Sequence, residues 1–372
     1  MSVDIRKLLV TAVEMNASDL HIVSGEPPVL RVRGEIQRLP GPPLSRIEVR
    51  QLADAILTDR LRAKFAEELS VDFSFALESK ARFRVNVFQQ SLGVSIALRR
   101  IPAKVLSLRE IDAPPVLQTI AEMRRGLVLV TGPTGSGKST TLAAIIDHIN
   151  KNRNEHLLTI EDPIEYVHTP SKCIINQREI GVHARSFSEA LRAALREDPD
   201  VILVGEMRDL ETISLAITAA ETGHLVLGTL HTNSAPESID RIIDAYPADE
   251  QKQIRTMLST SLKAVVAQTL VPTLAGGRMA IQEIMLVNTA IRALIRESKT
   301  HQIYSVMDTQ RGAGMQSMEQ GITKALNRRL ISPEVAEDTR QKVGIQSNQL
   351  SNNQPNTGYG GGGLGNRPPR ST

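Results

Sequence analysis

The sequence predicts an α/β protein with two domains and a short C-terminal tail. Its 372 residues are too many for one small domain, and strand-like and helix-like segments alternate after residue 115. A glycine-rich loop at 132–139 separates an apolar strand from a helix, an arrangement typical of phosphate-binding α/β folds. Because Trp is absent and aromatic residues make up only 3% of the chain, the cores must be aliphatic.

Residues 1–100 predict a small α+β domain. Helical periodicity covers 5–15 and 47–70. Strands are predicted at 20–23, 29–32, 71–77, 81–89 and 94–99. These elements indicate an antiparallel sheet packed on helices, and we interpret the proline-rich stretch 101–115 as a linker.

Residues 116–346 predict a mostly parallel sheet covered by helices on both faces. The expected strands are 126–131, 156–160, 200–204, 225–230 and 279–286. The expected helices between them are 139–152, 188–197, 209–221, 237–245 and 249–270. An all-helical region follows, with helices at 289–298, 301–307, 318–327 and 333–342. The glycine-rich segment 347–372 cannot form a packed core and predicts a disordered tail, unless it tethers a partner.

Composition excludes several classes of protein. The formal charge is only +3, without a basic stripe, so we expect no nucleic-acid partner. Cys173 is the single cysteine, which excludes an intramolecular disulfide and a tetracysteine zinc site. No stretch reaches the roughly 18 apolar residues of a membrane span, and the N-terminus does not resemble a signal peptide, so a cytoplasmic location is expected.

The glycine-rich loop predicts a nucleoside triphosphate site. Its glycines let backbone N–H groups converge on phosphates, Lys138 would neutralise the β- and γ-phosphates, and the Ser139 hydroxyl would bind Mg²⁺. The alternative is a glycine-rich turn that binds nothing, and the full motif in its strand–helix context disfavours it. The predicted nucleotide-binding residues are Gly132, Pro133, Thr134, Gly135, Ser136, Gly137, Lys138, Ser139 and Thr140.

Acidic residues follow two other apolar strands. Glu206 comes after the strand at 201–204, where it would orient or deprotonate water directly or through Mg²⁺. Glu161 and Asp162 follow the strand that ends near Ile160 and would bind metal or polarise water. The alternative for all of these carboxylates is a solvated loop position.

A histidine and a group of arginines are further candidates. His231 ends the strand at 225–230 and is either structural or a sensor of the γ-phosphate. Arg82, Arg84, Arg99 and Arg100 lie in the N-terminal domain. They either form a solvated face or reach a phosphate across an interface as arginine fingers.

Four motifs occur in one order and carry a family resemblance: GPTGSGKSTT, TIEDPIEY, DPDVILVGEMRD and GTLHTN. In them the chain resembles the secretion-superfamily ATPases of the type IV pilus and type II secretion group, over roughly residues 1–345. RFRVNVF at 82–88 and AIRALIRE at 290–297 are similar to the retraction ATPases of twitching motility. Pilus-assembly and type II secretion ATPases usually carry a tetracysteine zinc site and a longer N-terminal region. The single cysteine and the roughly 110 residues before the expected ATPase core argue against both classes.

The resemblance implies a role for each candidate residue. It implies a PAS-like N-terminal domain and a RecA-like ATPase domain that binds ATP and Mg²⁺. Glu206 would be the catalytic glutamate, Glu161 and Asp162 acidic groups near Mg²⁺ and water, and His231 the γ-phosphate sensor. Ser139, Glu161 and Glu206 would hold the metal. Some of the four arginines would act on the nucleotide of a neighbouring subunit.

The resemblance also implies partners. The ring would be a homohexamer at the inner membrane that engages the platform protein of the pilus machine, with an accessory retraction ATPase as a further partner. The motif associated with retraction predicts an amphipathic helix that contains Ala290, Ile291, Arg292, Leu294, Ile295 and Arg296.

Two other classes share the phosphate loop. A RecA-like nucleic-acid motor is disfavoured by the balanced charge and the lack of aromatic stacking positions. A module that only senses nucleotide is disfavoured by the full set of acidic and histidine motifs.

Overall fold

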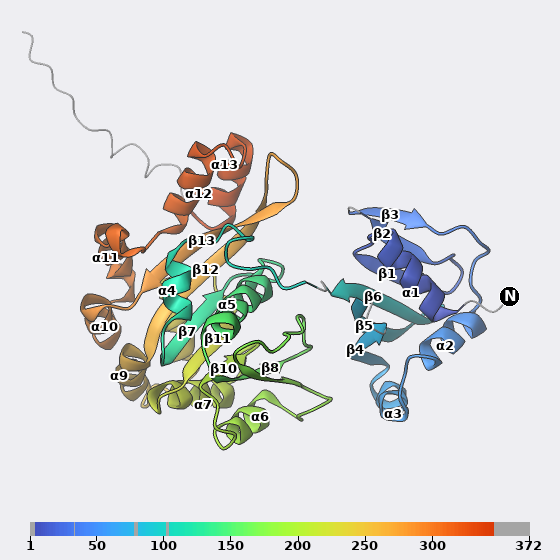
Figure 1. Ribbon diagram of the computed structural model, residues 1–372, viewed down its shortest axis with the longest axis horizontal. Helices are drawn as coiled ribbons and strands as arrows, with labels where there is room; N and C mark the ends of the chain where they lie inside the picture. The colour runs from blue at the N-terminus through green and yellow to red at the C-terminus, as the bar shows by residue number, and fades with distance from the viewer. Residues whose placement is uncertain (1–3, 33, 78–80, 102–103, 346–372) are drawn as a thin grey trace, which may run out of the picture.

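The computed structural model describes residues 4–32, 34–77, 81–101 and 104–345 (Figure 1). Each of the two predicted domain regions contains one β-sheet, and the boundaries between the domains stay a prediction. The predicted disordered tail at 347–372 lies outside the described residues, as do residues 102–103 of the predicted linker.

The N-terminal region forms a six-stranded sheet in the order β3-β2-β1-β6-β5-β4, with every neighbouring pair antiparallel. Its strands are β1 (Asp19–Val23), β2 (Val29–Val32), β3 (Glu35–Arg38), β4 (Ser70–Leu77), β5 (Ala81–Gln90) and β6 (Gly93–Ile101). Its helices are α1 (Ile5–Glu14), α2 (Arg46–Asp54) and α3 (Asp59–Glu68). The segment predicted as helical over 47–70 is therefore two helices, and the second begins after the N-cap Thr58.

The two faces of this sheet differ in chemistry. Residues such as Leu20, Val85 and Leu98 pack with α1, α2 and α3 in one buried cluster. Because side chains alternate across a strand, the neighbouring positions lie on the opposite face. Strand pairing aligns them as a polar row, which we define as Asp19, Arg99, Arg84 and Ser74.

The second sheet has seven strands in the order β13-β12-β7-β11-β10-β8-β9. All neighbours are parallel except β12 and β13, which are antiparallel. The strands are β7 (Gly126–Thr131), β8 (His156–Glu161), β9 (Ile174–Glu179), β10 (Val201–Val204), β11 (Leu225–Leu230), β12 (Leu262–Pro272) and β13 (Arg278–Leu286). The predicted mostly parallel sheet is confirmed.

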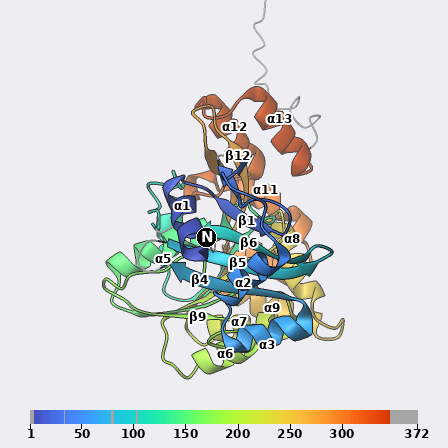
Figure 2. The same cartoon turned by 90° about the vertical axis from the view of Figure 1, so that its right-hand side faces the viewer.

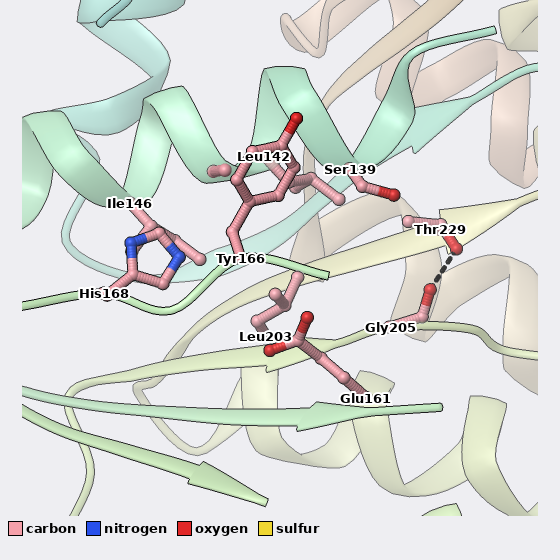
Figure 3. Close-up of a pocket in the computed structure, with 10 residues that line it drawn as sticks. Ser139, Leu142, Ile146, Glu161, Tyr166, His168, Leu203, Gly205 and Thr229 are labelled. Carbon is pink, nitrogen blue, oxygen red and sulfur yellow. Dashed lines mark hydrogen bonds between the residues drawn. The ribbon is translucent and has the colours of Figure 1, made fainter. Parts of the chain in front are cut away.

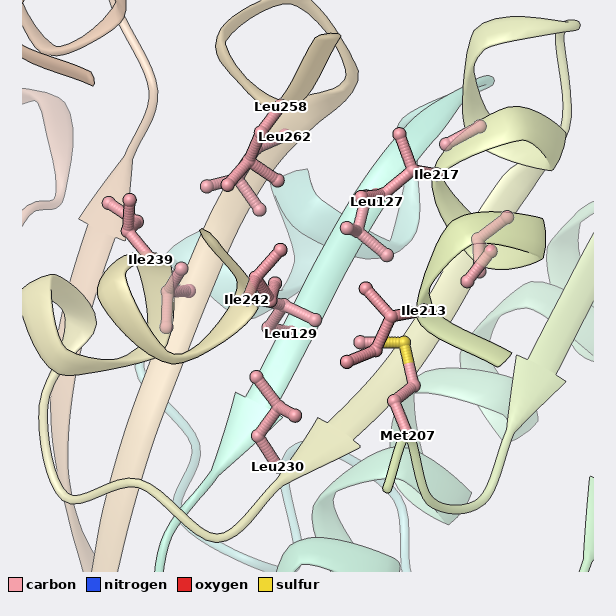
Figure 4. Close-up of a cluster of buried hydrophobic side chains, with 14 of the residues drawn as sticks. Leu127, Leu129, Met207, Ile213, Ile217, Leu230, Ile239, Ile242, Leu258 and Leu262 are labelled. Atoms are coloured by element: carbon pink, nitrogen blue, oxygen red, sulfur yellow. The ribbon is translucent and has the colours of Figure 1, made fainter. Parts of the chain in front are cut away.

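Helices cover both faces of this sheet (Figures 1 and 2). One face packs on α6 (Phe187–Ala194), α7 (Leu210–Glu221), α8 (Ala235–Asp244), α9 (Gln251–Ser261), α10 (Thr289–Arg296) and α11 (Ile303–Thr309). Figure 4 shows Leu127 and Leu129 of β7 in the cluster beneath them. The other face packs on α4 (Val116–Ala121) and α5 (Lys138–Asn152). At the far end of β12 and β13 lie α12 (Met318–Asn327) and α13 (Pro333–Lys342).

The helix predicted over 249–270 is wrong in its second half. The chain is helical only to Ser261 and then enters β12, which lies between β7 and β13. Residues 264–267 of β12 are fully buried. A strand buried on both faces shows no apolar–polar alternation, so its sequence does not distinguish it from a buried helix. The strands β3 and β9 and the helix α4 were not predicted from the sequence.

Capping residues explain why other boundaries were predicted well. The helices α12 and α13 have the bounds expected from the sequence. Ser317 and Gln320 form a reciprocal capping box at the start of α12. Ser332 accepts a hydrogen bond from the Val335 N–H, and Pro333 occupies the first turn of α13. No helix within the described residues is both long and apolar enough to span a membrane.

Replacing Leu129 with Ala should destabilise the second domain. Leu129 is fully buried in β7, an interior strand of the sheet, and removal of such a side chain costs about 2–5 kcal/mol because a cavity remains. Leu274→Ala is the control, since Leu274 is 63% exposed. Calorimetry should show a lower midpoint of unfolding for Leu129→Ala only, and equal midpoints would contradict this packing.

Candidate functional site

The glycine-rich loop connects β7 to α5 at the carboxyl edge of the sheet. Gly132 and Gly137 have φ angles of 140° and 89°, which favour glycine. Gly137 is the N-cap of α5, so the loop's N–H groups and the positive end of the helix dipole lie together. At the tip of the loop, Pro133, Thr134 and Gly135 are exposed.

Lys138 folds back on the loop. Its Nζ donates to the carbonyl oxygens of Gly132 at 2.7 Å and Pro133 at 3.1 Å. Burial lowers the pKa of Lys138, and the charges of Glu206 and Glu165 oppose that effect. The ammonium group therefore lies at the loop with two carboxylates near enough to favour its charged form.

Thr140, predicted to bind nucleotide, has a protein partner. Its hydroxyl is 2.9 Å from the hydroxyl of Tyr166. This contact connects α5 to the loop that follows β8.

Glu206, His231 and Arg208 form a cluster beyond the ends of β10 and β11. The His231 Nε2 lies 3.0 Å from the Glu206 Oε1, and the Arg208 Nε lies 2.5 Å from the same oxygen. Partial burial raises the pKa of Glu206, but hydrogen bonding and charge from Arg208 and His231 outweigh it and leave the pKa below its ordinary value. The structure thus brings two predicted site residues together and holds Glu206 as a carboxylate.

Glu161 lies in a different environment at the end of β8. It accepts hydrogen bonds from the Thr159 hydroxyl at 2.6 Å and from the Gln177 Nε2 at 3.3 Å. Burial nevertheless raises the pKa of Glu161 to about 7. Figure 3 shows its carboxyl group in a small pocket that Ser139 and Tyr166 also line.

Asp162 faces the N-terminal domain of the same chain. Burial raises the pKa of Asp162, and the charges of Arg84 and Arg208 counteract part of that rise. Next to it, the Ser74 hydroxyl donates to both carboxylate oxygens of Glu179 at 3.0 and 3.1 Å. These contacts join β4 of the first sheet to β9 of the second, and Figure 2 shows the first sheet in front of β9.

The four candidate arginines separate into two pairs. Arg82 donates to the Ser74 hydroxyl at 3.1 Å, and the charge of Arg84 acts on Asp162, so both lie on the side of the acidic loop. Arg99 instead pairs with Asp19 at 2.9 Å. Arg100 donates to the Asn16 side chain at 3.0 Å.

Comparisons with known proteins decide the family. The family model described as "Type II/IV secretion system protein" matches residues 1–276. The chain is 51% identical over 345 residues to the type IV pilus retraction ATPase PilT of Pseudomonas aeruginosa, covering 93% of this chain and 99% of that protein. The chain belongs to this secretion ATPase family.

Two further similarities narrow its position within the family. A twitching motility protein of Neisseria gonorrhoeae is 54% identical over 310 residues, 83% of each chain. A crystal structure of the pilus retraction motor PilT with bound ADP superposes with a TM-score of 0.86 at 45% identity, covering 94% of this chain and 99% of that one. The chain is a nucleotide-binding ATPase of the pilus-retraction type.

In this secretion ATPase, the segment of the predicted retraction motif is α10. Asn288 caps the helix by accepting from the Ile291 N–H at 2.9 Å. Ile291 and Ile295 are fully buried against the ATPase core, with Leu294 packed partly beside them. Ala290 and Arg296 are exposed, and Arg292 is half-buried. The predicted amphipathic helix is present.

Several residues of this region were not predicted from the sequence: Arg208, Tyr166, Gln177, Glu179 and Gln268. Arg208 lies two positions after Glu206, within the motif DPDVILVGEMRD. Gln268 is 1% exposed in a strand of apolar neighbours, and its Nε2 donates to the Ser136 carbonyl at 2.7 Å. A polar side chain in an apolar strand is the signal that would have identified it.

Replacing Lys138 with Ala should weaken nucleotide binding about 100-fold, because hydrogen bonds to a charged group contribute about 1.5–3 kcal/mol each. Titration with fluorescent ADP in the presence of Mg²⁺ measures the change. Lys151→Ala is the control, since Lys151 lies near the other end of α5 and pairs with Asp147 at 2.8 Å. Unchanged affinity in Lys138→Ala would contradict the assignment of the loop.

Proposed function

We propose that this chain is the subunit of a hexameric ATPase motor that retracts a type IV pilus. The observation that carries the proposal is the meeting of Lys138, Glu206 and His231 at one sheet edge in a chain 51% identical to a retraction ATPase. A phosphate-binding loop alone accounts for binding. A carboxylate held in its charged form beside it supplies the group that hydrolysis needs.

Glu206 is the proposed catalytic residue. As a carboxylate it accepts a proton from water or fixes the water for attack on the γ-phosphate. His231, at 3.0 Å, is the proposed sensor that donates to either Glu206 or a γ-phosphate oxygen. Arg208 contacts the same carboxylate oxygen and would help to hold Glu206 in its charged form.

The donor set suits Mg²⁺. Ser139 and Glu161 line one pocket, and Glu206 lies beyond the neighbouring strand β10. Hydroxyl and carboxylate oxygens are the hard ligands that Mg²⁺ prefers, and this ion usually completes its shell with water and substrate phosphates. Ser139, Glu161 and Glu206 are its proposed holders, with Asp162 beside them. When bound, the ion would neutralise charge on the phosphates.

The ring is proposed to complete each site from two subunits. Arg99 and Arg100 bond only within their own domain in the contacts described, while Arg82 and Arg84 lie beside the acidic loop of their own chain. Each of the four is a candidate to reach a neighbour's nucleotide after the domains rotate. Such a rotation would exchange an arginine's contacts within the chain for an ion pair to phosphate, which converts binding energy into motion.

Further parts of the proposal concern architecture and partners. The sheet and helices within 1–100 support a PAS-like domain, and the second sheet with its helices supports a RecA-like domain over 116–346 with C-terminal helices. The stretch 101–115 is the proposed linker, and its first residue, Ile101, still belongs to β6. The exposed side of α10 would contact the platform protein of the inner membrane. This contact would keep the cytoplasmic ring at the membrane. An accessory retraction ATPase is a further proposed partner.

Glu206→Gln should retain nucleotide binding and lose turnover by at least about 100-fold, because the amide cannot accept a proton. Binding of fluorescent ADP and release of phosphate from Mg-ATP measure the two properties separately. Glu211→Gln is the matched control, since Glu211 is an exposed carboxylate near Arg192 at the start of α7. Normal turnover in Glu206→Gln would remove its catalytic role.

Deletion of the gene should leave cells immobile with excess surface pili, because assembly would continue without retraction. Counting pili by electron microscopy and measuring twitching zones tests this. Bald cells would instead indicate an assembly ATPase, and a milder defect would indicate an accessory retraction ATPase. DNA-stimulated ATP hydrolysis would favour the nucleic-acid motor over both.

A further inference from the structure

Gln268 lies directly beneath the phosphate-binding loop. It belongs to β12, the strand next to β7, and is 1% exposed. A Cβ added at Gly132 would lie 2.2 Å from the Gln268 backbone oxygen, and one added at Gly137 would lie 3.2 Å from its Nε2. Gln268 therefore touches both ends of the loop, and only glycine fits at Gly132.

The side chain of Gln268 makes a directed set of hydrogen bonds. Its Nε2 donates to the Ser136 carbonyl at 2.7 Å, and its Oε1 accepts from the Thr141 hydroxyl at 2.9 Å. The Oε1 also accepts from the Gln282 Nε2 at 3.2 Å. Because the Ser136 carbonyl can only accept a hydrogen bond, the amide nitrogen of Gln268 has to face it. The Thr141 and Gln282 donors on the Oε1 side fix that orientation.

The bond to Ser136 determines where the next N–H points. A trans peptide group is planar, so its C=O and N–H point in opposite directions. When Gln268 holds the Ser136 carbonyl toward the sheet, the N–H of Gly137 points away from the sheet. That N–H is at the N-terminus of α5, among the groups that bind phosphate in a loop of this type.

From this geometry we infer that Gln268 is a positioning residue for nucleotide: it preorients the Ser136–Gly137 peptide toward the phosphates. The inference rests on the proposed nucleotide site and adds a residue outside the four motifs. Without the bond, the Ser136–Gly137 peptide would have this orientation in only a fraction of the molecules. The apparent affinity for nucleotide would fall by that fraction.

Gln268→Met tests the inference, since Met has a similar volume and no amide. We expect the dissociation constant for Mg-ADP and the KM for ATP to rise about tenfold, which corresponds to the loss of one hydrogen bond. The kcat should change less than about twofold, because the Ser136–Gly137 peptide would bind the phosphates equally in the bound substrate and in the transition state.

Gln282→Met is the matched control. It removes a hydrogen bond from the same buried network without touching the loop, and Gln282 is 4% exposed. We expect a similar loss of thermal stability in the nucleotide-free protein. The dissociation constant should rise no more than about threefold, because Gln282 is only one of the two donors to the Gln268 Oε1 and the bond to Ser136 remains. An equal loss of affinity in both variants, or no loss in Gln268→Met, would overturn the inference.

Thr141→Val keeps the test decisive if Gln268→Met fails to fold. It leaves Gln268 in place and removes one of the donors that orient its amide. We expect a rise of about threefold in the dissociation constant for Mg-ADP, and no rise would contradict the inference. Wild-type protein that binds no Mg-ADP would refute the nucleotide site itself, which is a separate outcome.

Discussion

The aligned pairing of parallel strands is the constraint on which the site depends. Register places Ile160 of β8, Val204 of β10, Gly228 of β11 and Leu129 of β7 in one row. The residues that follow these strands therefore emerge at one edge, although they are far apart in sequence. A shift of one residue in any pairing would turn the site side chains of that strand to the other face.

Two glutamates at this edge have opposite electrostatic environments. Arg208 and His231 keep the pKa of Glu206 low, whereas burial raises that of Glu161 to about 7. Environments that separate the pKa values of neighbouring acids are a recurrent means of dividing roles between them. We expect Glu206 to act as the charged group and Glu161 to remain partly protonated at neutral pH until a cation arrives.

The sequence predicted those parts of the site that local pattern encodes. The loop at 132–139, Glu206 and His231 follow apolar strands, so strand ends alone located them. Gln268 and the pair of Ser74 with Glu179 were not predicted. Ser136 and Thr141 lie more than one hundred positions from Gln268 in the chain, and Ser74 lies equally far from Glu179. Misreading β12 as helix had the same cause: its burial comes from β7 and β13 and leaves no periodic signal.

The location of β12 connects the phosphate-binding loop to the C-terminal region. The strand bonds to β7 on one side and to β13 on the other, so it lies between the loop and the C-terminal helices. On the far side, the Gln316 Nε2, just before α12, donates to the backbone carbonyl of Gln282 at 2.7 Å. The Ser136 carbonyl is thus bonded to a buried polar network. A shift of the Ser136–Gly137 peptide would break hydrogen bonds that have few alternative partners. Such a network holds the loop rigid, and it gives the C-terminal region a physical contact with the nucleotide site that does not pass through Glu206 or His231.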